Sequence, residues 1–223
     1  MAIIRQPIRM RLPILDRDKV DLGLPLCTLD VNQVAIRPTY HQRPDLRGLT
    51  CLEYNYFELR SVELCVTPET AIEISQGVET SSLGAVAFRR ISKSALFKAR
   101  PASTVLDLSD GEAEELWSDM SQSLWPGLST GAMTRGQVAD VSQLFFHTVC
   151  SSMVANSAFV TLDRNFLDRA VDLRTRYGIS VLCPNDAWGT FAPRYSLVTP
   201  SESDVNRLLS EQQSFFAGLR SSY

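Results

Sequence analysis

Short apolar runs recur along the chain, and each stops at a polar or turn-forming residue. Runs of this length, rich in aliphatic and β-branched side chains, are typical of buried β-strands. Asp30, Asp163 and Pro184 directly follow three of them, and such residues commonly end a strand in a turn. The pattern predicts strands over Leu24–Leu29, Ser61–Thr67, Ala158–Leu162 and Ile179–Cys183.

Between these runs, apolar residues recur at helical spacing and predict amphipathic helices. Ser109 or Asp110 is placed to cap a helix in the acidic stretch that follows, and Gly178 is placed to end another. Residues 37–50 are rich in Arg and Pro and are predicted to form a basic loop. Helices are predicted over residues 69–75, 110–124, 134–154 and 166–177, with a last one that begins near Ser201 or Ser203 and carries Phe215 and Phe216.

The alternation of strands and helices indicates an α/β fold with a mainly parallel sheet. A length of 223 residues fits one large domain, or one domain with appended arms. We expect an N-terminal arm over residues 1–24, a main domain over residues 25–190 and a C-terminal extension with a helix over residues 191–223. Residues 76–133 form a predicted helical segment within the main domain.

Composition and charge narrow the function classes. Lys and Arg number 22 against 25 Asp and Glu, which excludes a protein that holds nucleic acid through overall basicity. The five cysteines form no C-x-x-C pair, so we expect reduced thiols in a cytoplasmic protein. Arg5, Arg9 and Arg11 interrupt the N-terminal apolar residues, and no segment approaches ~18 uninterrupted apolar residues. We therefore expect neither a signal peptide nor membrane association.

Acidic residues fall where the predicted strands end. Asp30 and Asp163 directly follow strands, and Glu73 follows the strand ending at Thr67 by less than two helical turns. Asp140 lies early in the helix that leads into the strand before Asp163. Because ligands bind at the carboxyl ends of parallel strands, these four carboxylates are predicted to converge there. Two carboxylates ~4 Å apart repel by about 4 kcal/mol, so such a cluster favours a divalent cation, and oxygen ligands favour Mg²⁺ or Mn²⁺.

The block over residues 158–184 contains a strand ending Thr161-Leu162-Asp163, a helix, a Gly and a strand ending in Pro. It resembles the C-terminal signature of the PIN-domain nucleases, and Asp30-Val31-Asn32 is similar to the Asp-x-Asn that ends the first strand of that family. In the resemblance, Glu73 and Asp140 match the second and third acids, whereas Asn32 and Thr161 match the polar residues that support the acids.

The resemblance implies a three-layer α/β/α fold and hydrolysis of RNA with Mg²⁺ or Mn²⁺. Asp30, Asp140 and Asp163 would be metal ligands, and Glu73 a ligand or the residue that orients the water. It also allows a toxin of a toxin–antitoxin pair, with an inhibitory antitoxin-type protein as partner. The C-terminal helix with Phe215 and Phe216 is predicted to pack on the body of the protein or on a second copy of the chain. Substrate phosphates would need a basic rim, for which the candidates are Arg37, Arg43, Arg89, Arg90, Lys93 and Arg164.

Simpler interpretations stand beside these. Asp163 precedes a helix and is placed to be its N-cap, and Asp30 with Asn32 fits an Asx turn. The chain is alternatively a catalytically silent PIN-like module that binds RNA or a protein. Residues 127–131 match G-x-S-x-G, but a nucleophile elbow needs a strand before the Ser, and an acidic helix precedes it here. His147 sits in an apolar run and is predicted to be a core histidine.

Overall fold

A central parallel sheet organises the protein. The computed structural model describes residues 15, 21, 23–30, 44–67, 69–70, 108–151, 154–207 and 210, without the side chain of residue 110. Its strands are β1 (Leu26–Leu29), β2 (Glu63–Val66), β3 (Ser157–Val160) and β4 (Val181–Leu182), in the order β2-β1-β3-β4. Three of them lie within runs predicted from the sequence, and β3 begins one residue before its predicted run.

The register of the sheet aligns the carboxyl ends of its three longer strands. Leu29, the last residue of β1, pairs with Val66 of β2 on one side and Val160 of β3 on the other. All pairings are parallel, so the residues that follow these strands leave the sheet at the same edge. Asp30 and Thr161 are the next residues along β1 and β3, which places both at this edge.

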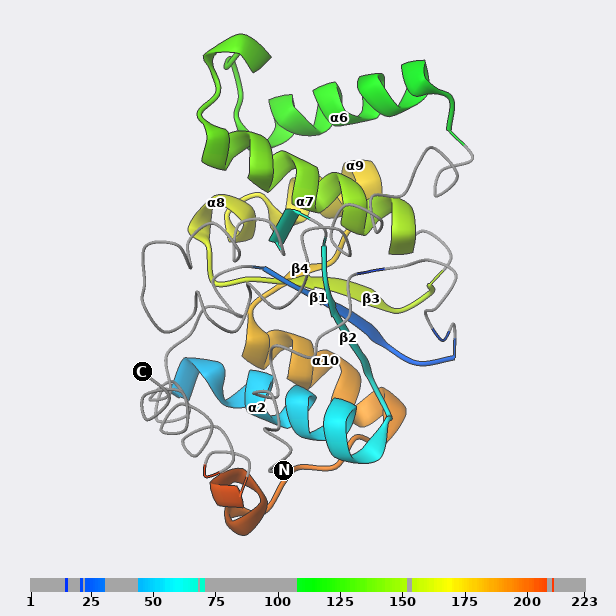
Figure 1. Cartoon of the computed structure of the whole chain (residues 1–223), viewed down its shortest axis with the longest axis vertical. Coiled ribbons are helices and arrows are strands. Elements are labelled where there is room, and N and C mark those ends of the chain that lie inside the picture. The colour runs from blue at the N-terminus through cyan, green and yellow to red at the C-terminus, as the bar shows by residue number, and fades with distance from the viewer. Residues whose placement is uncertain are drawn as a thin grey trace, which may run out of the picture.

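Helices cover both faces of the sheet and make a three-layer α/β/α arrangement (Figure 1). Cys27 and Leu29 point to one face, where they share a buried cluster with side chains of α2 (Arg47–Tyr54) and α10 (Pro184–Tyr195). Phe159 points to the other face. It packs there in a second cluster with residues of α6 (Asp110–Leu124), α7 (Arg135–Ser151) and α9 (Ala170–Tyr177).

Two helices begin at caps that the sequence contains. Ser109 accepts a hydrogen bond from the backbone N–H of Glu112, whose carboxylate accepts one from Ser109 N, so a capping box starts α6. Thr134 and Gln137 exchange the same pair of hydrogen bonds at the start of α7. The predicted helix over residues 134–154 is therefore confirmed over Arg135–Ser151, and Val154 is not helical.

The predicted basic loop over residues 37–50 is wrong in its second half. A 3-10 turn over Pro44–Leu46 leads directly into α2. Gly48 was part of the loop prediction, but its role is close packing between helices. Its N–H donates to Asn185 Oδ1 over 2.7 Å, and a Cβ atom at this position would overlap the carbonyl oxygen of Pro184.

The helix predicted over residues 166–177 is two helices, α8 (Arg164–Leu167) and α9. Between them the N–H of Arg169 donates to the carbonyl of Phe166, three residues back, which interrupts the i→i−4 ladder. The predicted stop is confirmed, since Gly178 ends α9 with a positive φ of 73°.

The C-terminal part of the described chain is hydrogen-bonded to the segment that follows α2. α10 continues through residue 190, where the extension was predicted to begin, and residues 202–207 are helical. A π-helical turn over Asn55–Leu59 follows α2, and the buried Asn55 side chain bonds both the N–H and the carbonyl of Val198. Within the described ranges, none of the helices combines the length and apolar character that a membrane crossing requires.

Candidate functional site

The Thr161 hydroxyl connects the ends of two neighbouring strands. Thr161 follows β3, is fully buried, and donates from Oγ1 to Oδ2 of Asp30 over 2.7 Å. The same oxygen accepts the backbone N–H of Asp163 at 2.9 Å. One hydroxyl therefore orients the Asp30 carboxylate and fixes the turn that carries Asp163. Two of the four predicted acids are brought together in this way.

The two acids differ in burial and in their other contacts. Asp30 is only 1% exposed, and its N–H donates to the carbonyl of Val160, so strand pairing extends to this residue. Asp163 is half-buried and is the N-cap of α8, where Oδ1 accepts the N–H of Asn165 at 2.8 Å. The N-cap interpretation of Asp163 is thus confirmed. Its Oδ2 atom has no hydrogen bond within the described part of the chain.

Polar residues on one face of α7 form hydrogen bonds with the sheet and with the segment that follows β2. His147 Nδ1 lies 2.9 Å from Oγ1 of Thr28, in the middle of β1. One helical turn earlier, Gln143 accepts a hydrogen bond from Thr70, just past the carboxyl end of β2. The N-terminal part of α7 therefore lies over the edge where Asp30 stands.

Asp140 lies on this same face of α7, one turn before Gln143. It is half-buried and lies one helical turn beyond Gln143 in the direction away from His147. It does not, however, complete a compact cluster with the other two acids. Among the described residues, no three His, Cys, Asp or Glu side chains form a group that could hold a metal ion.

The chemistry of the donor set still fits Mg²⁺ or Mn²⁺. The acids at this edge offer carboxylate oxygens, and the neighbouring polar side chain is a hydroxyl, with no thiolate at the end of β1 or β3. Hard divalent cations take such oxygens, and an ionised carboxylate has about four lone-pair sites. One hydrogen bond to Asp163 therefore leaves that group able to bind a cation.

Most other predicted site residues lie outside the described residues. Glu73, the predicted fourth acid, and Asn32, the predicted support of Asp30, belong to this group, and so do most of the predicted basic rim, namely Arg37, Arg43, Arg89, Arg90 and Lys93. Arg164 is described, and it is exposed directly beside Asp163. It stays a candidate for the predicted basic rim.

The local structure argues against a serine nucleophile at Ser129 and against an acid–base role for His147. Ser129 is exposed and precedes a 3-10 turn over Thr130–Ala132, and the chain reaches it from the end of α6. It therefore lacks the strand that a nucleophile elbow needs. His147 is buried, as predicted for a core histidine, and its burial lowers its pKa to about 3. All five cysteines are free thiols, and burial raises the pKa of Cys65 to about 12.

The sequence analysis missed the polar residues that link α7 to the sheet. Thr28, Thr70 and Gln143 are each fully buried and hydrogen-bonded. They could have been noticed as polar residues at positions where the pattern of a buried strand or helix face predicts a hydrophobic residue. Such residues are expensive to bury without partners, so they indicate a side-chain network.

No model of a known protein family, no curated protein and no solved structure matches this chain.

We predict that Thr161→Val destabilises the protein by about 1–3 kcal/mol, because the buried Asp30 carboxylate loses the hydrogen bond from this hydroxyl while the side-chain shape is kept. Thr161→Ser keeps the hydroxyl and loses one methyl group, at about 1 kcal/mol. Urea denaturation of the three proteins measures both. A Val variant as stable as the wild type would show that the hydrogen bond to Asp30 contributes nothing to stability.

The buried His147 predicts a specific loss of stability in mild acid. Its pKa is about 3 in the folded protein, against about 6.5 when unfolded. The unfolded chain therefore binds the extra proton first, and stability falls as the pH drops below 6.5. Between pH 7.5 and 5.0 the wild type should lose about 2 kcal/mol more than a His147→Asn variant does over the same interval. An identical loss of stability in the wild type and the His147→Asn variant would contradict the lowered pKa of His147.

Proposed function

We propose that this protein is a Mg²⁺- or Mn²⁺-dependent endoribonuclease that hydrolyses RNA phosphodiester bonds. One observation carries the proposal. Asp30 and Asp163 follow adjacent parallel strands at the carboxyl edge of an α/β/α sheet, and the Thr161 hydroxyl joins them. That edge is where open α/β sheets bind their ligands, and the residues are those that carry the resemblance to PIN-domain nucleases.

The residues that would hold the ion are Asp30 and Asp163, and Asp140 and Glu73 are the further candidate ligands from the sequence. When bound, a divalent cation neutralises charge on phosphoryl oxygens and makes water a better nucleophile. The chain contributes orientation. Thr161 holds one Asp30 oxygen in place, and the N-cap bond to Asn165 holds Oδ1 of Asp163. Arg164 offers an exposed cation for a substrate phosphate beside them.

RNA is the substrate under this proposal, and the cytoplasm is the compartment. An inhibitory protein of the antitoxin type or a second copy of the chain would be a further partner.

A second candidate is a catalytically silent PIN-like module that binds RNA or a protein. Both described strand-end acids already have structural partners, since Asp30 accepts from Thr161 and Asp163 caps α8. These contacts stabilise the fold without any metal. If the two acids serve only the fold, the protein is the silent module.

A cleavage assay separates the two candidates. Labelled single-stranded RNA is incubated with the protein and Mn²⁺ or Mg²⁺, with EDTA as one arm. We expect cutting that EDTA stops and that Asp163→Asn reduces by roughly 100-fold or more. Asn is also a good N-cap, so this variant should fold normally. The matched control is Asp172→Asn, which changes an exposed carboxylate on α9 and should cut like the wild type.

Cutting that survives EDTA, or an Asp163→Asn variant as active as the wild type, would contradict the nuclease proposal. A folded wild-type protein that cuts no RNA in a broad panel would favour the silent module.

A further inference from the structure

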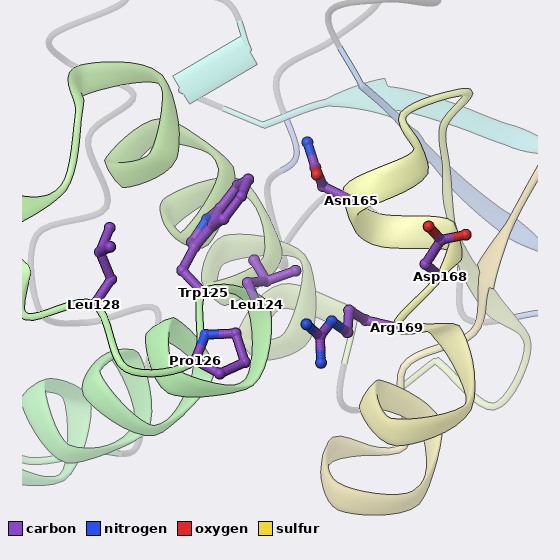
Figure 2. A pocket seen from close by; sticks show the side chains of 7 residues that line it. All are labelled: Leu124, Trp125, Pro126, Leu128, Asn165, Asp168 and Arg169. Atoms are coloured by element: carbon purple, nitrogen blue, oxygen red, sulfur yellow. The ribbon is translucent and has the colours of Figure 1, made fainter.

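A cavity of about 350 Å³ opens between the end of α6 and the junction of α8 with α9. Figure 2 shows side chains from both segments around the same space. Leu124, Trp125 and Pro126 line it from the α6 side, and Asn165, Asp168 and Arg169 line it from the other. Small-molecule sites measure roughly 300–1,000 Å³, so this cavity suits one flat ring system with its substituents.

The α6 wall of the cavity is held by its own hydrogen bonds. Gln122 donates from Nε2 to the carbonyl of Leu128 and accepts at Oε1 the N–H of Gly127, which closes the turn after α6. Gly127 has a φ of 77°, a conformation that favours glycine. This wall is therefore preformed.

The opposite wall is continuous with the candidate metal site. The N–H of Asn165 donates to Asp163, and between Asn165 and Asp168 the side chain of Phe166 is buried in the core. α6 is in turn fixed to α9, because Asp119 bonds both Arg176 and Tyr177. The cavity thus begins two residues along the chain from Asp163, at a fixed position relative to it.

The polar groups of the cavity have hydrogen-bonding capacity to spare. Asp168 and Arg169 form no salt bridge with any other described residue. Trp125, the C-cap residue of α6, also lines the cavity, but its Nε1 atom is buried and is not one of these accessible polar groups.

This combination matches a nucleobase better than a simple anion. An indole beside apolar walls provides a stacking surface, which is worth about 1–3 kcal/mol per base in single-strand binding. Arg169 is a donor suited to the O6 and N7 acceptors of guanine. The carboxylate of Asp168 accepts from N–H donors, which guanine carries at N1 and N2. A phosphate alone would use the arginine and be repelled by the aspartate.

We propose that this cavity binds an unpaired guanine base of RNA, stacked on Trp125 and recognised by Arg169 and Asp168. The inference rests on the proposed function, because it assigns the base that lies beside the phosphate cut at Asp30 and Asp163. It gives the protein a base preference near the cleavage position. It also gives a role to the end of α6, which lies in the predicted helical segment over residues 76–133.

The test measures base binding without catalysis. A Trp117→Phe/Trp188→Phe variant leaves Trp125 as its single tryptophan, and guanosine monophosphate is titrated into it in EDTA. We expect saturable fluorescence quenching, with uridine monophosphate binding about tenfold more weakly. Adding Arg169→Ala should raise the dissociation constant for the guanine nucleotide about tenfold or more.

Two further variants complete the design. Arg174→Ala removes an exposed arginine of α9 that does not line the cavity, and it should leave binding unchanged. Asp163→Asn should also bind guanosine monophosphate normally, because stacking needs no metal ligand. Binding that shows this pattern supports the cavity assignment whether or not the protein cuts RNA.

The results that would overturn the guanine site do not depend on whether the protein cuts RNA. Absent quenching, equal binding of the two nucleotides, or an Arg169→Ala variant that binds like the Arg174→Ala control would overturn the guanine site even in a protein that cuts RNA. Normal guanine binding by a protein that never cuts would overturn the proposed function alone.

Discussion

A carboxylate buried at the end of a parallel strand needs a hydrogen-bond donor beside it, and in this protein the Thr161 hydroxyl is that donor for Asp30. The same oxygen accepts the N–H of Asp163, so two chain segments 131 residues apart meet at one atom. The parallel register of β1 and β3 makes this meeting possible, because it carries both chains to the same edge of the sheet. The rest of the candidate site is arranged around this contact.

The two helical layers have different tasks in supporting that edge. α2 and α10 pack so closely that only glycine fits at position 48, and they form an apolar layer behind the sheet. The layer with α7 contains the buried polar contacts to Thr28 and Thr70. Because each of these polar groups is paired, α7 has one favourable position over the sheet, and this fixes where Asp140 stands. Apolar clusters on both faces of the sheet supply stability, and the buried polar contacts of α7 supply position.

The sequence predicted the sheet and much of the second helical layer. Its strands are short apolar runs ended by Asp or Pro, and α6 begins at a capping box that is visible in the sequence as Ser109 and Glu112. These are local signals, and local patterns are sufficient to identify them. The strand-end positions of Asp30 and Asp163 were also predictable, since they follow from where the apolar runs stop.

What the sequence did not predict depends on long-range contacts. Gly48 appears as a loop residue until Pro184 of α10 is known to lie against it, 136 positions further along the chain. The break between α8 and α9 has no Pro or Gly to announce it. The cavity beside Trp125 joins two segments that no local pattern connects. Predicting that cavity would have required knowing how α6 packs against α9.

Isothermal titration calorimetry with Mn²⁺ tests the metal site most directly, because it needs no RNA substrate. The wild type and Asp172→Asn should give the same saturable heat, and Asp30→Asn and Asp163→Asn should lose it while remaining folded by circular dichroism. The absence of saturable heat in the folded wild type, or unchanged heat in the Asp30→Asn variant, would contradict the assignment of this edge as a metal site.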